Sequence, residues 1–129
     1  MDDLIAFLRA RLNEDADLAL AASPGPWHPG EEHDEVLAVD DIVVAEGFAL
    51  SGRQLRATVD HIARHDPARV LAEVDAKGRL VDLTSGMLSA AEGDSEVDHY
   101  GGLDAAEAVL RATALPFAEH PDYQDAWRP

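Results

Sequence analysis

The sequence contains no cysteine and few aromatic residues, and each shortage excludes a class of protein. Without cysteine the chain forms no disulfide, has no thiolate nucleophile and binds no zinc or iron–sulfur cluster through sulfur. With only two Trp, two Tyr and three Phe in 129 residues, aliphatic and alanine side chains must fill most of the core. A chain without cysteine suits a reducing compartment, so we expect a cytoplasmic protein.

Long apolar runs and a basic leader are also missing. No apolar stretch approaches the roughly 20 residues that a membrane-spanning helix needs, and the N-terminal Met1-Asp2-Asp3 lacks the positive charge of a signal peptide. We therefore expect no membrane association. A hydrophobic content of 47% with 28% charged residues is typical of globular proteins. The length predicts a single domain over residues 1–129.

Basic residues are scarce, and their distribution is uneven. Lys and Arg total 10 against 26 Asp and Glu, which gives a formal charge of −16. Residues 31–46 contain seven acids and no base, whereas residues 52–80 contain six bases and four acids. Because nucleic-acid binding through phosphates needs clustered Lys and Arg, we expect no nucleic-acid partner. The acids keep the protein soluble in the simplest interpretation; alternatively, gathered on one face, they imitate nucleic acid for a basic partner.

The apolar spacing predicts four helices. The first runs from about Asp3 to Ala22 and ends at the prolines and glycine of residues 23–26. The fourth covers Leu103 to Leu115.

The second and third predicted helices meet at a Pro-containing junction. Ser51 and Gln54 form a capping box at the start of the second helix. This helix stops near His65, because a residue close before proline leaves the helical region. Asp66 then serves as N-cap and Pro67 as the first residue of the third helix. We expect that helix to continue toward Leu88, with Gly78 and Gly86 as weak points.

Two short β-branched runs predict a hairpin at about residues 36–45, with Asp40-Asp41 as its turn. Two strands alone are marginal, so a third strand near Trp27-His28 or a helix across one face must complete the sheet. The tail repeats aromatic residues at Phe117, Tyr123 and Trp127, which indicates that it packs on the body. The predicted fold class is α+β, with three to four helices packed on a small antiparallel sheet.

His61 and His65 stand four residues apart, so they share one face of the second helix. At 100° per residue they fall at roughly 200° and 240°, away from the apolar stripe at roughly 340°. This orientation argues against two core histidines. The bland interpretation is that His65 complements the C-terminal end of its helix and Asp66 caps the next one.

Two functional hypotheses use the same run. In the first, an anion or phosphate binds where the third helix begins, and its backbone N–H groups assist; the anion-binding residues are His61, Arg64, His65 and Arg69. In the second, a divalent transition metal binds to His61, His65 and Asp66. The other candidate third ligands are His33, His99 and His120. The glutamate of the His-Glu-x-x-His peptidase pattern is absent, because Ile62 follows His61.

Several segments resemble a family of short actinobacterial and actinophage proteins known as a domain of unknown function. The segments that carry this resemblance are residues 3–12, 22–27, 61–74 and 114–129. The Pro-Gly-Pro-Trp turn and the His-Ile-Ala helix are also similar, more loosely, to the Ead/Ea22-like group of phage proteins. The resemblance implies a bacterial, cytosolic and phage- or prophage-borne setting, and it brings no catalytic residue.

These observations favour a non-enzymatic binding protein. The expected partner is another protein or a small anionic, nucleotide-like ligand, in a role that would include phage counter-defence. Two alternatives stay open at this point: a metal-dependent hydrolase that uses His61 and His65, and an acidic mimic of nucleic acid. No cofactor is expected under the leading hypothesis.

Overall fold

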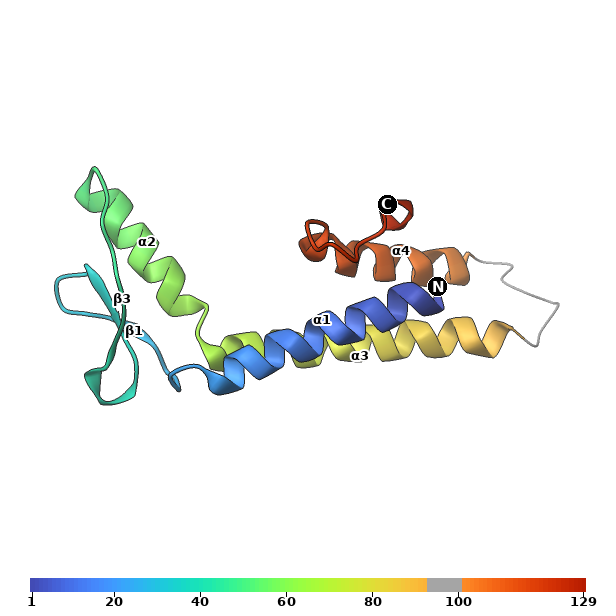
Figure 1. Ribbon diagram of the computed structural model, residues 1–129, viewed down its shortest axis with the longest axis horizontal. Coiled ribbons are helices and arrows are strands. Elements are labelled where there is room, and N and C mark those ends of the chain that lie inside the picture. Colours follow the sequence, from blue (N-terminus) through green and yellow to red (C-terminus); the bar gives the residue numbers. More distant parts are fainter. Residues whose placement is uncertain (93–100) are drawn as a thin grey trace. The chain divides into compact units, whose positions relative to one another are not determined.

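The computed structural model describes residues 1–92 and 101–129 and divides by internal contacts into two compact units (Figure 1). Unit 1 comprises Met1–Glu14 and Val74–Pro129, and unit 2 comprises Asp15–Glu73. In the described residues, four α-helices and a three-stranded antiparallel sheet confirm the predicted α+β class. None of the helices in the described ranges is both long enough and apolar enough to cross a membrane.

The sheet of unit 2 has the order β1-β2-β3, formed by His28–Pro29, Glu35–Leu37 and Val43–Glu46. The predicted hairpin is therefore present as β2 and β3, and β1 supplies the third strand. The strands are shorter than the sequence pattern indicates, because Val39–Asp41 forms a short 3₁₀ turn (η1) and a register shift interrupts the ladder after Val36.

The hairpin turns at the two aspartates that the sequence indicates. Asp40 and Asp41 have φ values of 60° and 56°, the sign that a primed hairpin turn requires at both central residues. The Ala38 N–H donates to the Ile42 carbonyl at 2.8 Å and closes the loop. Aspartate tolerates this left-handed conformation better than most residues do, which explains how Asp-Asp replaces the commoner Asn-Gly.

Helix α2 (Gly52–Arg64) covers one face of the sheet. The Ser51 hydroxyl accepts the Gln54 N–H at 3.2 Å, which confirms the predicted N-cap, and His65 is the C-cap. Val59 is fully buried and packs with Val36 of β2. Gly47 permits this approach, because a Cβ there would lie 2.8 Å from the Leu55 side chain.

The core of unit 1 lies among α1 (Asp2–Ala21), α3 (Pro67–Ala91) and α4 (Gly102–Ala114). Its fully buried side chains include Leu8 on α1, Val81 on α3 and Leu110 on α4. Helix α3 passes Gly78 and Gly86 without a break and ends three residues beyond Leu88. Each glycine costs about 1 kcal/mol in a helix, and the burial of apolar side chains between them offsets that cost.

The aromatic tail of unit 1 is packed down, as its sequence predicts. Trp127, in the short η3 turn (Asp125–Trp127), is buried at 6% exposure. Its ring lies 5.1 Å from that of Phe7 on α1 and 5.6 Å from that of Tyr123. Phe117, in η2 (Leu115–Phe117), meets Phe7 edge to face. Phe7 is thus the aromatic centre on which the tail closes.

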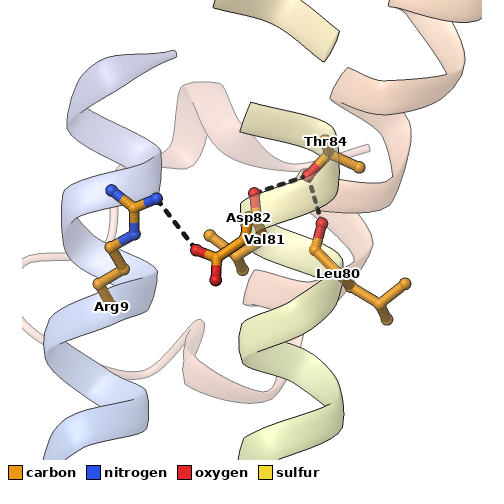
Figure 2. Close-up of polar contacts among 5 residues, drawn as sticks. All are labelled: Arg9, Leu80, Val81, Asp82 and Thr84. Atoms are coloured by element: carbon orange, nitrogen blue, oxygen red, sulfur yellow. Dashed lines mark hydrogen bonds and ion pairs between the residues drawn. The ribbon is translucent and has the colours of Figure 1, made fainter. Parts of the chain in front are cut away.

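An exposed ion pair links α1 to α3 in unit 1, next to a hydroxyl that is bonded within α3 (Figure 2). The Arg9 guanidinium donates to the Asp82 carboxylate at 3.2 Å. The buried Thr84 hydroxyl lies 2.7 Å from the Leu80 carbonyl and 3.2 Å from the Val81 carbonyl, so it is satisfied within its own helix.

Candidate functional site

His61 and His65 lie exposed on the outer side of α2, as the helical geometry predicts. Their rings are 4.4 Å apart, and the His65 Nδ1 donates to the His61 carbonyl at 2.7 Å. Because the His65 backbone N–H goes to the Ile62 carbonyl, the ring supplies the donor that the last turn lacks. His65 therefore has a structural role in ending α2.

The two arginines of the anion hypothesis have different surroundings. Arg69 on α3 donates from Nε to the Glu73 carboxylate at 3.0 Å, one turn further along the helix. Arg64 lies at the end of α2 and lines a shallow hollow with Asp60 and Asp66. Of the four anion-binding candidates, Arg64 lines this hollow, and the described lining does not include His61, His65 or Arg69.

Asp66 caps α3 and also accepts a second hydrogen bond from a distant part of the chain. Its Oδ1 accepts the Arg69 N–H at 3.0 Å, which confirms it as the N-cap of α3. Its Oδ2 accepts the backbone N–H of Trp27 at 3.2 Å and so ties the segment before β1 to the helix junction. Gly25 leaves room for this carboxylate, because a Cβ at that position would lie 2.8 Å from the same oxygen and would displace it.

These contacts bear on the metal hypothesis. Both Asp66 oxygens and the His65 Nδ1 already have hydrogen-bond partners. Within the described ranges, no three His, Cys, Asp or Glu side chains come together in an arrangement that could hold a metal ion. Of the other candidate ligands, His33 faces Asp60 at 3.5 Å, and His99 lies outside the described residues. The metal site stays a prediction from sequence alone.

A hollow of about 370 Å³ does lie beside the α2–α3 corner. Trp27, His28 and Pro29 form one side of it, and the α2 end forms the other. Among its described lining residues Arg64 is the single arginine or lysine, whereas Asp60 and Asp66 supply two carboxylates. A site with more negative than positive charge repels phosphate, so its composition disfavours a nucleotide-like ligand.

A larger hollow, of about 600 Å³, lies on the face of the sheet opposite α2. Its floor is a cross-strand row in which His28 of β1 pairs with Leu37 of β2 and Leu37 pairs with Val43 of β3. Residues directly opposite in a ladder share a face. Val36, one residue earlier, points the other way and is buried against α2. The floor is therefore the uncovered side of the sheet.

Carboxylates surround this floor. They come from the turn between β1 and β2, from β2 itself and from the hairpin turn: Glu31, Glu32, Asp34, Glu35 and Asp41. The described lining includes no lysine or arginine. The described lining also contains the imidazole of His28, with its Nε2 at 3.7 Å from Asp41 Oδ1. We call this surface the acidic sheet face. It presents apolar side chains at its base and negative charge around them.

The sequence contains a signal for the acidic sheet face, although the acids alone are equally compatible with solubility and with a face for a basic partner. Glu35 and Leu37 alternate with the buried Val36, a period of two that places both on the outer side of a strand. The density of acids in residues 31–46 is also visible in the sequence. What the sequence does not give is the register that brings Val43 and His28 beside Leu37.

Comparison with known families decides the classification. The model of a family of unknown function, DUF6221, matches residues 1–129. The chain belongs to this family. The match agrees with the expected membership in a domain of unknown function. Neither the curated proteins nor the solved structures contain a match to the chain.

Proposed function

We propose that this DUF6221 protein is a non-enzymatic interaction protein that binds a basic segment of a protein partner on its acidic sheet face. The observation that carries the proposal is the combination of an apolar strand floor with a carboxylate surround in one hollow. A lysine or arginine side chain has the complementary form, because its aliphatic stem covers apolar surface while its charged head stays at the rim.

The charges of unit 2 support a protein partner over the anionic ligand. The acids of residues 31–46 lie around the sheet, whereas Arg53, Arg56 and Arg64 lie on α2. The unit thus separates its acidic strands from its basic helix. Complementary charge of this kind steers association and fixes the orientation of the partner. An acidic mimic of nucleic acid would use the same face, with a nucleic-acid-binding surface as the basic partner.

The setting is part of the proposal. We infer a bacterial, cytoplasmic protein carried by phage or prophage, with a host defence protein as one class of basic partner. This inference rests on the sequence resemblance to actinobacterial and actinophage proteins and on the cysteine-free composition.

The test uses a matched pair of double variants. Glu31→Gln with Glu32→Gln removes two charges from the acidic sheet face, and Asp17→Asn with Glu119→Gln removes two exposed charges elsewhere. Both change the formal charge from −16 to −14. The probe is a synthetic peptide of alternating arginine and leucine, titrated by calorimetry at low and moderate salt.

We expect the sheet-face variant to weaken peptide binding roughly three- to tenfold, since each exposed charge pair contributes about 0.2–1 kcal/mol, and the control to leave it nearly unchanged. NMR shift changes should concentrate in residues 28–46. Val43→Ser should also weaken binding, because it removes part of the apolar floor. Equal losses in both double variants would reduce the interaction to unspecific charge attraction and refute the proposal.

A further inference from the structure

Helix α3 carries an apolar stripe on the side that faces away from the core of unit 1. Leu80, Leu83 and Met87 are 45%, 63% and 41% exposed, so three large apolar side chains of this helix face solvent. Ala76 and Ala90 are exposed at its two ends. At 100° per residue these five residues fall within about 80° of arc. We call them the α3 stripe.

The α3 stripe is distinct from the core-facing side of the same helix. Val81 is fully buried, and the centre of the stripe lies about 140° around the helix from it. In Figure 2 the Leu80 side chain points away from α1, whereas Asp82 points toward Arg9 of α1. The spacing of the stripe is four, three, four and three residues, the repeat of a seam between two packed helices.

The stripe is nearly symmetric about Leu83. Leu80 and Met87 stand three and four residues from it, and Ala76 and Ala90 stand seven residues from it on either side. An interface with two-fold symmetry requires a surface that complements itself. Two antiparallel copies of α3 that cross at Leu83 meet this requirement: Leu83 faces its own copy, Leu80 faces Met87, and Ala76 faces Ala90.

Charge favours the same arrangement. Helix α3 contains three bases (Arg69, Lys77, Arg79) and three acids (Glu73, Asp75, Asp82), so it is neutral in a chain of charge −16. Residues 83–91 contain no charged residue. In an antiparallel pair, Asp75, Lys77 and Arg79 of one copy lie beside this uncharged half of the other. In a parallel pair each charged residue would instead lie beside the same residue of the other copy, so like charges would repel.

We propose that the α3 stripe is the interface of an antiparallel homodimer. A second copy of the chain is the occupant that matches both the symmetry and the charge pattern. The stripe is about 20 Å long. One helix face of this length buries less surface than the roughly 800 Å² per partner that is common in stable interfaces. The dimer is therefore expected to dissociate in the micromolar range.

A charge-pair experiment tests the interface and its register together. In Leu83→Glu and in Leu83→Lys, two like charges meet at the two-fold axis, so each variant alone should be monomeric by analytical ultracentrifugation. An equimolar mixture should restore the dimer, because opposite charges then meet. Ser89→Glu and Ser89→Lys are the matched controls on the other side of α3 and should dimerise like the parent chain.

Disulfide trapping provides a second readout that does not depend on weakening the fold. The chain has no cysteine, so Leu83→Cys introduces a unique thiol. Mild oxidation should convert it to a covalent dimer, since cysteines at a two-fold axis approach within bonding distance, and Ser89→Cys should stay largely uncoupled. A parent chain that remains monomeric at several hundred micromolar, or equal trapping of both cysteines, would overturn the proposal.

Discussion

Unit 1 and unit 2 bury their apolar side chains in different ways. Unit 1 closes an aromatic tail over three helices, and its core includes Leu8, Leu110 and Trp127. Unit 2 has a smaller cluster, with Val36, Val59 and Ala63 as its buried members. Its irregular segments are held by specific polar contacts, such as those of Asp66 with Trp27 and with Arg69.

The difference separates two sources of stability. Large side chains in unit 1 contribute transfer and packing energy in proportion to the area they bury. Unit 2 has short strands joined by turns, so its backbone groups depend more on caps and turns. The acidic sheet face of unit 2 takes several of its lining residues from turns, which is consistent with binding sites lying on loops that a scaffold positions.

The largest expected effect comes from the core of unit 1. Leu110→Ala should lower the free energy of unfolding by about 2–5 kcal/mol, because it leaves a cavity in a fully buried position. Each unit contains one tryptophan, Trp127 in unit 1 and Trp27 in unit 2. Denaturant unfolding followed in Trp27→Phe and Trp127→Phe backgrounds reports the two units separately.

In Leu110→Ala we expect the unfolding transition that Trp127 reports to lose more free energy of unfolding than the one that Trp27 reports. If the two signals shift equally, the chain unfolds as one cooperative domain over residues 1–129, as its length predicts, and the contrast between the units does not extend to their stability. Val59→Ala, at a fully buried position of unit 2, is the reciprocal control and should affect the Trp27 signal more.

An intermediate effect is expected at the polar junction of unit 2. Asp66→Ala removes the N-cap of α3 and the acceptor of the Trp27 N–H, so it should destabilise unit 2 by about 1–3 kcal/mol. Asp66→Asn keeps a capping oxygen and should recover part of the loss. Hydrogen exchange should show faster exchange at Trp27 and Arg69. Unchanged protection at both amides would contradict the role assigned to Asp66.

The smallest effect should come from a polar atom inside the aromatic core. The Tyr123 hydroxyl is buried without a hydrogen-bond partner among the residues that the structure describes. Removing an unsatisfied buried hydroxyl eliminates its desolvation cost. Tyr123→Phe should therefore leave stability unchanged or raise it by about 0.5–1 kcal/mol, measured by thermal unfolding. A clear loss of stability in Tyr123→Phe would mean that the hydroxyl has a hydrogen-bond partner such as bound water.

Much of the local structure follows from particular residues. Ser51 with Gln54 and Asp66 with Pro67 place the helix ends within a residue or two, since caps and prolines act through neighbouring backbone groups. The exposure of His61 and His65 follows from helical geometry. The predicted end of α3, near Leu88, falls three residues short of Ala91, and the helix passes Gly78 and Gly86 because burial of Val81 outweighs their local cost.

The candidate site was much less accessible from the sequence. His61, Arg64, His65 and Arg69 are close along the chain, yet their partners are the His61 carbonyl for His65 and Glu73 for Arg69. Sequence proximity predicts a cluster, and the structure brings the His61 and His65 rings to 4.4 Å, whereas Arg69 pairs with Glu73. Conversely, the acidic sheet face joins β1, β2, β3 and two turns, and only strand register brings these together.

By itself the sequence determined the fold class, the helix ends, the hairpin turn at Asp40-Asp41 and the family, because these depend on residues near one another or on a continuous pattern. The tertiary structure decided which acids surround Leu37 and Val43, and that Leu80, Leu83 and Met87 remain uncovered. Exposure and concavity depend on what packs against a side chain. Which segment packs against a side chain is decided only when segments distant in the sequence come into contact.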